Sequence, residues 1–291
     1  MMRDALARDL RDAGAAVILP AEDADPWESL AGLAVEADAV WPVAPESGGL
    51  LEKAAALAAA SGRPVLASDA GTLAIAGSKS ATSRHLAAAG IRVVPSYGDA
   101  LSLPLAPGGW VMKPDDGAGA EETHFLAHPV PVKPGHVLQP FLPGIPASFS
   151  MLAREGEGWL LSCNLQEMEV VDGVFSYRGG IIGGAERYRA DWEHLAGAIA
   201  AALPGLWGYL GVDLIEGEAG PVVLEINPRL TTSYAGLRDS IGLNPAGLVL
   251  DLLDHPLSAL IRPLSPRPVT VTVPRPVTVT VPRPGAVAVP R

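Results

Sequence analysis

The stretch GYLGVDLIEGEAGPVVLEINPRLTTSYAGL, residues 208–237, decides how the rest of the chain is interpreted. It contains two short apolar runs, 211–216 and 221–226, separated by the turn residues Gly217–Gly220. Apolar runs of this length around a glycine-containing turn are typical of a β-hairpin. We therefore predict a hairpin here and look for chemistry on its faces.

The predicted hairpin carries polar side chains at neighbouring strand ends. Because side chains alternate along a strand, Glu225 and Asn227 share a face, and Asp213 lies on one face of the other strand. Two ionised carboxylates repel each other unless a hard cation such as Mg²⁺ neutralises them. Arg229 follows with a guanidinium suited to phosphate oxygens. The alternative is a surface hairpin with solvated carboxylates, which the apolar run VVLEIN disfavours.

Composition describes a soluble globular protein. The 291 residues are 48% hydrophobic, which is enough for two or three domains with their own cores. No apolar run reaches the roughly 18 residues of a membrane span, and no signal peptide opens the chain. Cys163 is the only cysteine, which excludes an intramolecular disulfide and makes the cytoplasm the expected location.

The negative charge is concentrated in the body of the chain. Net charge is −11, with 21 Lys and Arg against 32 Asp and Glu. Five of the arginines and none of the acids fall in the last 30 residues, so the body has 16 basic residues against 32 acidic ones. An acidic body argues against a nucleic-acid partner, and a polyanionic ligand would need local Lys, Arg or metal.

The first part of the chain alternates helical and extended patterns. The patterns predict helices over 2–13, 26–35 and 50–61 and strands over 15–19, 37–43 and 64–68. Such alternation indicates a small parallel sheet with ligands at the strand ends. The unit begins with a helix where a strand is usual, so we expect its first strand to be missing or to precede Met1.

Two further segments could bind an anion. In APESGGLLEK, residues 44–53, Glu46 could accept from an amine and the backbone of 47–49 could bind an anion, or the loop could simply begin a helix. SKSATSRHLAAAG, residues 78–90, predicts a capped helix with Lys79 at its start, and the strand 91–94 follows. Lys79 could instead be a solvated surface residue.

A cation also ends the next predicted strand. The strand 110–113 finishes at Lys113 and runs into the glycine-containing loop DDGAGA, residues 115–120. This layout is that of a phosphate clamp, in which lysine supplies charge and the loop supplies N–H groups. Asp115 and Asp116 oppose anion binding unless they point away.

The later part of the chain predicts an antiparallel sheet with helices. Its expected strands are 137–141, 149–153, 159–166, 169–171 and 174–177, followed by a helix over 190–203. From Pro266 the sequence repeats PRPVTVTV, which favours an edge strand or an extended arm. We expect this tail to be flexible, with an intermolecular contact arm as the alternative.

Taken in order, these motifs resemble the ATP-grasp superfamily over residues 1–260. Within it, APESGGLLEK, SKSATSRHLAAAGI and LEINPRLTTSYAGLR are most similar to the tyramine–glutamate ligase group of methanofuran biosynthesis. The resemblance implies α/β plus α+β architecture: a Rossmann-like pre-ATP-grasp domain before a two-subdomain ATP-grasp fold. The implied divisions are 1–76, 77–144, 145–262 with the metal site, and a tail over 263–291.

The resemblance also implies roles for individual residues. ATP would be bound by Lys79, Lys113, Gly117, Gly119, Gln139, Phe141 and Leu142, with Gly117–Gly119 as a closing loop and 139–142 as the hinge to adenine. One or two Mg²⁺ ions, with Mn²⁺ as the alternative, would be held by Asp213, Glu225 and Asn227. Arg229 and Lys113 would act catalytically on the transferred phosphate. The substrates would contact Glu46, Arg178, Ser233 and Tyr234. The hinge departs from the family pattern, because no acid follows Gln139 before Glu155.

The implied reaction joins two small molecules. A carboxylate, glutamate for this group, attacks the γ-phosphate of ATP to give an acylphosphate, and a tyrosine- or tyramine-like amine then displaces phosphate to form an amide. The reaction needs charge neutralisation and in-line positioning rather than a side-chain nucleophile. A ligase for another amino-acid-like pair and a nucleotide-binding protein impaired in catalysis are the alternatives. A homo-oligomer is left open; nucleic acid and membrane are not expected partners.

Overall fold

The computed structural model describes residues 1–21, 24–100 and 103–273. In this part of the chain nine strands form one sheet in the order β3-β1-β2-β6-β5-β4-β7-β8, and β9 pairs with β6. The strands are β1 (Trp110–Pro114), β2 (His124–Leu126), β3 (His136–Pro140), β4 (Ile145–Arg154), β5 (Glu157–Val171), β6 (Val174–Ile182), β7 (Gly208–Gly217), β8 (Gly220–Asn227) and β9 (Val269–Thr272). All of these strand pairs are antiparallel.

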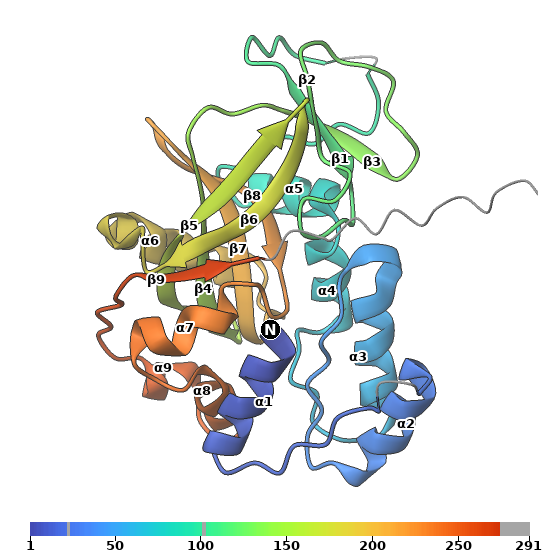
Figure 1. The fold of residues 1–291 in the computed structure, drawn as a ribbon, viewed down its shortest axis with the longest axis vertical. Coiled ribbons are helices and arrows are strands. Elements are labelled where there is room, and N and C mark those ends of the chain that lie inside the picture. The colour runs from blue at the N-terminus through green and yellow to red at the C-terminus, as the bar shows by residue number, and fades with distance from the viewer. Residues whose placement is uncertain (22–23, 101–102, 274–291) are drawn as a thin grey trace, which may run out of the picture.

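Helices cover the lower part of the sheet, and β1–β3 extend from its top (Figure 1). The helices are α1 (Met2–Asp12), α2 (Pro26–Glu36), α3 (Leu50–Ala60), α4 (Ala70–Ala76), α5 (Lys79–Ala88), α6 (Arg189–Ala202), α7 (Tyr234–Ile241), α8 (Pro245–Asp251) and α9 (Leu257–Leu260). Two short 3₁₀ turns, η1 (Ser47–Gly49) and η2 (Glu186–Tyr188), precede α3 and α6. In the described ranges no helix has the length and apolar character to cross a membrane.

Local sequence explains where several helices begin. Ser78 caps α5 by accepting a hydrogen bond from the backbone N–H of Ala81 at 3.1 Å. Asp25 and Asn244 cap α2 and α8 in the same way, and each is followed by a proline at the first helical position. Proline fits there because its missing N–H would have had no helical partner.

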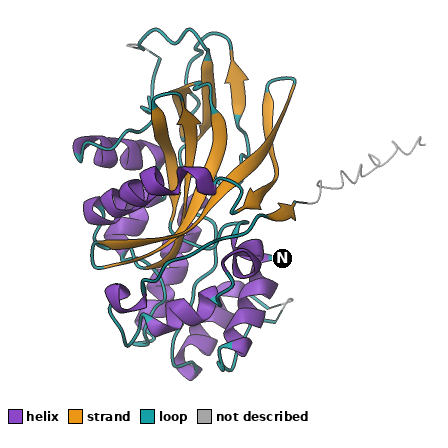
Figure 2. Cartoon of the chain, turned by 90° about the vertical axis from the view of Figure 1, so that its left-hand side faces the viewer, coloured by secondary structure: helices purple, strands orange, loops and turns teal. Residues whose placement is uncertain are grey.

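The two faces of the central sheet bury different helices, as the side view also indicates (Figure 2). On β7, Leu210, Val212 and Leu214 belong to a core that includes Trp192 of α6. Tyr209 faces the second core, which is built with α1, α7, α8 and α9. Strand alternation therefore divides β7 between the two layers.

The central hairpin has the predicted strands and faces. β7 and β8 close at Gly217 and Gly220, and Val212 and Leu214 are buried in the core. The register shifts after Asp213, because Glu225 pairs with Asp213 while Val223 pairs with Leu214. Leu224 is therefore the extra residue of a β-bulge, which turns this part of β8.

The small parallel sheet expected in the first 70 residues is almost absent. Residues 15–19 form no strand, and Ile18 and Leu19 are exposed. The strands expected at 37–43 and 64–68 are reduced to one parallel bridge, Val40 to Val65. Without a neighbouring strand, an apolar run such as 15–19 has no ladder of backbone hydrogen bonds to hold it extended.

Other boundaries also differ from the expected ones. The strands predicted at 159–166 and 169–171 are one long strand, β5, and the segment 91–94 contributes a single parallel bridge from Val93 to β8. The tail expected to be flexible begins with strand β9, which pairs with residues 179–182 of β6. Val271 of β9 is buried in the second core, and this burial explains the ordered strand. The rest of the repeat, 274–291, lies outside the described residues.

We predict that Trp192→Ala lowers the free energy of unfolding by about 3–5 kcal/mol in urea denaturation. Trp192 is fully buried, stacks on Tyr188 at 5.5 Å between ring centroids, and donates a 2.8 Å hydrogen bond from Nε1 to Glu216 Oε2. The substitution leaves both a cavity and a buried carboxylate without its donor. His194→Ala, at an exposed position of the same helix, should change stability by less than about 0.5 kcal/mol. Equal losses in the two variants would contradict this account of the core.

Candidate functional site

A cavity of about 520 Å³ opens beside the β7–β8 hairpin. It lies between the hairpin, the β1–β3 strands and the β5–β6 hairpin, so both ends of the sheet contribute to it. Most of the residues predicted to bind ATP, metal or substrate line it: Lys79, Lys113, Gly117, Gly119, Gln139, Phe141, Leu142, Asp213, Glu225, Asn227, Arg229 and Ser233. Glu46, Arg178 and Tyr234 do not.

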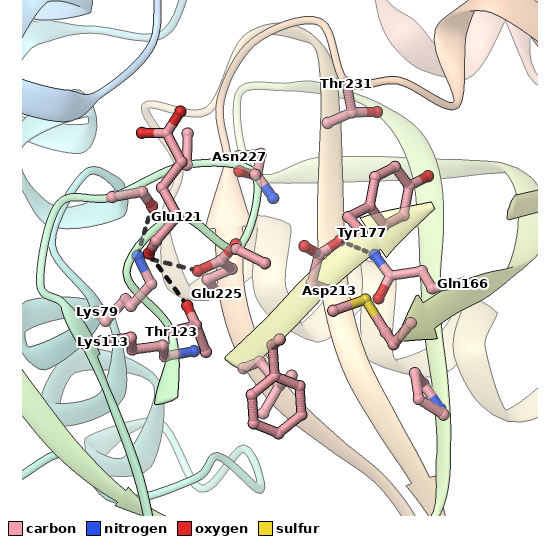
Figure 3. A pocket seen from close by; sticks show the side chains of 18 of the residues that line it. Lys79, Lys113, Glu121, Thr123, Gln166, Tyr177, Asp213, Glu225, Asn227 and Thr231 are labelled. Atoms are coloured by element: carbon pink, nitrogen blue, oxygen red, sulfur yellow. Dashed lines mark hydrogen bonds and ion pairs between the residues drawn. The ribbon is translucent and has the colours of Figure 1, made fainter. Parts of the chain in front are cut away.

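The two carboxylates of the hairpin lie directly opposite each other. Asp213 pairs with Glu225 across β7 and β8, and Gly211 pairs with Asn227 two positions further on. The pairing places all three oxygen-bearing side chains along one wall of the cavity (Figure 3). Carboxylate and amide oxygens are the ligands that Mg²⁺ accepts.

The two carboxylates differ in their pKa values because their neighbours differ. Burial and, after it, the charge of Glu225 raise the pKa of Asp213 to about 8. Burial also acts to raise the pKa of Glu225, but the charges of Lys79 and Lys113 outweigh it and lower that pKa to about 2. Asp213 has an amide donor instead, Gln166 Nε2, at 3.0 Å from its Oδ1.

Lys79 is a buried component of the site rather than a solvated surface lysine. Its Nζ lies 3.1 Å from Glu225 Oε2 and donates to the carbonyl oxygen of Gly117 at 2.7 Å. The first residue of α5 is therefore bonded both to the hairpin and to the glycine-containing loop. This arrangement joins three segments that are far apart in sequence.

Lys113, at the end of β1, is the second cation of the cavity. Its side chain is buried, and this burial lowers its pKa to about 8, although the nearby charge of Glu225 acts in the opposite direction. Figure 3 shows Lys79 and Lys113 on the same side of the cavity, near Glu225. Two lysines there supply the positive charge that a phosphate chain needs.

The two aspartates of the DDGAGA loop do point away from the cavity. Asp115 Oδ1 accepts from the backbone N–H of Ser80 at 2.7 Å, and its Oδ2 accepts from Ser78 Oγ at 2.6 Å. Asp116 Oδ2 accepts from the backbone N–H of Gly48 at 2.8 Å. The anion that reaches the 47–49 loop is thus a carboxylate of the same chain, and neither aspartate opposes phosphate binding.

The segment expected to be the hinge contributes both polar and apolar groups. Gln139 is buried, and its Nε2 donates to Ser96 Oγ at 2.8 Å. Phe141 and Leu142 line the cavity, and the Phe141 ring packs edge-on against Phe125. This wall offers an apolar surface and backbone groups, without a carboxylate.

Three residues proposed as substrate contacts lie elsewhere. Glu46 is bound to Arg229, with 2.7 Å between its Oε2 and the Arg229 Nε. Tyr177 faces the cavity, so the next residue of the strand, Arg178, points to the opposite face of the sheet. There Arg178 pairs with Glu169 across β5 and β6. Tyr234 is fully buried in the second core, where its ring contacts Tyr209.

Several lining residues were not singled out from the sequence, and four of them form one wall. They are Gln166, Met168, Phe175 and Tyr177, on β5 and β6. Phe175 and Tyr177 are two residues apart within the predicted strand 174–177, so alternation indicated that they share a face. Met168 fell between the predicted strands 159–166 and 169–171, and only the continuous strand β5 places it on the face of Gln166. Nothing in the sequence indicated that this hairpin bends over the cavity.

Comparison with known proteins identifies the family. The family described as ATP-grasp domain matches residues 76–233, and the one described as pre ATP-grasp 3 domain matches residues 1–72. The chain belongs to the ATP-grasp family. A search of curated proteins gives no match.

Several solved structures of ATP-grasp proteins are similar to this chain. An ATP-grasp superfamily protein from Archaeoglobus fulgidus is 25% identical with a TM-score of 0.64, over 78% of this chain and 69% of that one. The L-amino acid ligase from Bacillus licheniformis is 20% identical with a TM-score of 0.60, over 81% of this chain and 61% of that ligase. The biotin carboxylase domain of the Hydrogenobacter thermophilus 2-oxoglutarate carboxylase, in complex with MgADP and bicarbonate, is 14% identical with a TM-score of 0.64, over 86% and 67%.

These matches confirm the coarse predictions. The fold class, a pre-ATP-grasp domain followed by an ATP-grasp fold, is the one expected. The expected enzyme class, an ATP-dependent ligase that forms C–N bonds, agrees with membership of the ATP-grasp family. The similarity to the last two structures concerns the fold.

We predict that Asp115→Ala lowers the free energy of unfolding by about 1–3 kcal/mol in urea denaturation, because Asp115 receives two of the donors at the start of α5. The same substitution should weaken nucleotide binding, since Lys79 is the first residue of that helix. Asp116→Ala is the matched control: it removes a single exposed hydrogen bond and should cost less than about 1 kcal/mol. A larger loss for Asp116→Ala than for Asp115→Ala would contradict these assignments.

Proposed function

We propose that this protein is an ATP- and Mg²⁺-dependent ligase that joins a carboxylate to an amine through an acylphosphate. The observation that carries the proposal is the convergence of Lys79, Lys113, Asp213 and Glu225 on one cavity. The cations suit a phosphate chain, and the carboxylates suit a divalent cation that bridges it. No side chain needs to act as a nucleophile in such a reaction.

The residues present fit a magnesium site. Asp213 and Glu225 lie opposite each other with Asn227 nearby, and all three offer hard oxygen ligands. A bound Mg²⁺ would neutralise phosphate charge and orient the terminal phosphate. One or two ions, with Mn²⁺ as the alternative, belong to this proposal.

The chain's own residues would position ATP. Lys79 and Lys113 would pair with phosphate oxygens, the 117–119 loop would cover them, and Gln139, Phe141 and Leu142 would lie against the base. Closure of the loop excludes water, which an acylphosphate requires because water would hydrolyse it. Arg229 would stabilise the transferred phosphate through the N–H group that its protein contacts leave available.

The substrate assignment rests on the sequence resemblance. We propose glutamate as the carboxylate and a tyrosine- or tyramine-like amine, in cytoplasmic synthesis of a methanofuran-type cofactor. The L-amino acid ligase among the similar structures supports an amino-acid-like substrate. Met168, Phe175 and Tyr177 supply an apolar and aromatic wall on which an aromatic amine can pack. A ligase for another amino-acid-like pair is the second candidate.

The experiment is a substrate panel with Mg²⁺–ATP and phosphate release as the measurement. Glutamate with tyramine or tyrosine should release phosphate above the rate with ATP alone, and mass spectrometry should detect the amide. Phosphate release only with other acid–amine pairs would contradict the proposed substrates but support the proposed reaction. If Mg²⁺–ADP shifts the melting temperature but no pair releases phosphate, the protein binds nucleotide and is impaired in catalysis, and the ligase proposal fails.

We predict that Glu225→Gln abolishes turnover in the productive pair, to less than about 1% of wild type, while the circular dichroism spectrum stays native. The substitution removes a proposed metal ligand and the partner of Lys79. Glu218→Gln, in the exposed turn of the same hairpin, should keep wild-type activity. Full activity in Glu225→Gln would overturn the metal assignment. Chelation of divalent cations with EDTA should likewise abolish phosphate release.

A further inference from the structure

Arg229 is held by the protein on nearly every donor. Its Nε and Nη2 each lie 2.7 Å from Glu46 Oε2, and Nη2 also donates to Asn227 Oδ1 at 3.1 Å. Its Nη1 donates to the carbonyl oxygen of Leu230 at 2.9 Å. A guanidinium has five N–H donors, so within the described residues only one N–H, on Nη1, remains for a ligand. Arg229 is therefore fixed in place before any substrate arrives.

The Glu46 carboxylate does not face the cavity. Its Oε1 is buried and has no hydrogen-bond partner among the residues described, and the side chain lies against Leu73 and Gly77. A Cβ atom added at Gly77 would lie 3.7 Å from the Glu46 Cβ, which shows how closely the two segments pack. A substrate amine in the cavity cannot reach this carboxylate. The contact that remains for Glu46 is Arg229.

The loop that carries Glu46 is itself rigidly placed. Glu46 precedes the η1 turn, where Gly48 and Gly49 both have positive φ values, 64° and 68°. The backbone N–H of Gly49 donates to the Glu46 carbonyl oxygen at 2.9 Å, and the N–H of Gly48 donates to Asp116. One loop therefore contacts both the segment after β8 and the segment after β1. These are the two segments that carry the proposed metal and phosphate contacts.

Removing the Glu46 charge would release the group that orients Asn227. With Arg229 donating to Asn227 Oδ1, the amide must present its oxygen on that side. An amide oxygen has two lone pairs, so one remains for a cation. A buried guanidinium without its carboxylate partner carries an uncompensated charge and turns to other acceptors.

We propose that Glu46 is a positioning residue, which fixes Arg229 and, through it, the amide of Asn227. The inference rests on the proposed function, since it concerns the phosphate and metal end of the same site. Glu46 touches no substrate. It sets the geometry in which Arg229 and Asn227 meet the nucleotide, and a small displacement there lowers the rate of the chemical step.

The first test is Glu46→Gln, which keeps the side-chain shape and one acceptor oxygen but removes the charge. With the productive substrate pair, kcat should fall by about tenfold or more, while the KM for ATP changes by less than about threefold. A purely structural role would lower the melting temperature without this division between kcat and KM. Glu52→Gln, an exposed acid in the helix that follows the loop, is the matched control and should match wild type.

The second test is a double-mutant cycle with Arg229→Lys. If Glu46 acts through Arg229, then Glu46→Gln causes no further loss of kcat in the Arg229→Lys background. Additive losses would overturn the proposal, as would a Glu46→Gln variant with wild-type kcat. Glu46→Asp keeps the charge but withdraws the carboxylate by one methylene, and it replaces Glu46→Gln in the cycle if that variant does not give a native circular dichroism spectrum.

A binding measurement separates this inference from the proposed reaction. Calorimetric titration with Mg²⁺–ADP should show affinity reduced by about twofold in Glu46→Gln, within the limit expected for KM, but unchanged in Glu52→Gln. If no acid–amine pair releases phosphate, the ligase reaction fails, and this titration alone decides the role of Glu46. Equal affinities in wild type and Glu46→Gln would then overturn it. A wild-type protein that binds no Mg²⁺–ADP overturns both proposals.

Discussion

The repulsion between Asp213 and Glu225 is the constraint around which the cavity is built. The register of β7 and β8 places the two carboxylates opposite each other, where like charges destabilise a strand pair. Lys79 offsets this repulsion with a 3.1 Å ion pair to Glu225, and it comes from a helix about 150 positions earlier in the chain. Helix α5 therefore supplies the cation that lies against this pair of acids. Helix α5, with the β1 loop bonded at its start, is thereby held beside the cavity.

The acidic loop after β1 also has protein partners for its charges. Asp115 and Asp116 would repel a phosphate if they faced the cavity, and the sequence alone leaves their direction open. In the structure both carboxylates accept hydrogen bonds from the protein. Asp115 accepts from the hydroxyl and backbone groups at the start of α5, and Asp116 accepts from the backbone of the 47–49 loop. Their negative charge thus stabilises a helix start and a tight turn. Neither aspartate forms an ion pair with Lys79 or Lys113, the two lysines that line the cavity.

Sequence reasoning succeeded where the chain determines its own geometry locally. The hairpin, the cap at Ser78 and the lysine at the end of β1 are all set by neighbours within a few residues, so their patterns could be interpreted directly. It failed where a distant segment decides the outcome. Glu46 and Arg178 were taken as free charges, but each has a partner that only the folded chain reveals. Ser233 and Tyr234 were both expected to contact the substrates; Ser233 lines the cavity, but the start of α7 turns Tyr234 into the core. The run 15–19 has strand composition without a neighbour, and β9 gains its neighbour from β6 and its apolar support from the core.

The charge of the cavity gives an argument for a divalent cation that does not depend on any relative. In the described part of the chain its lining holds three cations, Lys79, Lys113 and Arg229, and three acids, Glu121, Asp213 and Glu225. Arg229 is already neutralised by Glu46, and Lys79 by Glu225. Lys113 alone has no ion pair within 4.0 Å there, and burial lowers its pKa to about 8, so its charge is partly lost in mildly alkaline solution. A triphosphate in this cavity would bring more negative charge than one lysine can offset. A divalent cation bound to Asp213 and Glu225 would supply the remaining neutralisation, and it would also offset the repulsion between these two facing carboxylates.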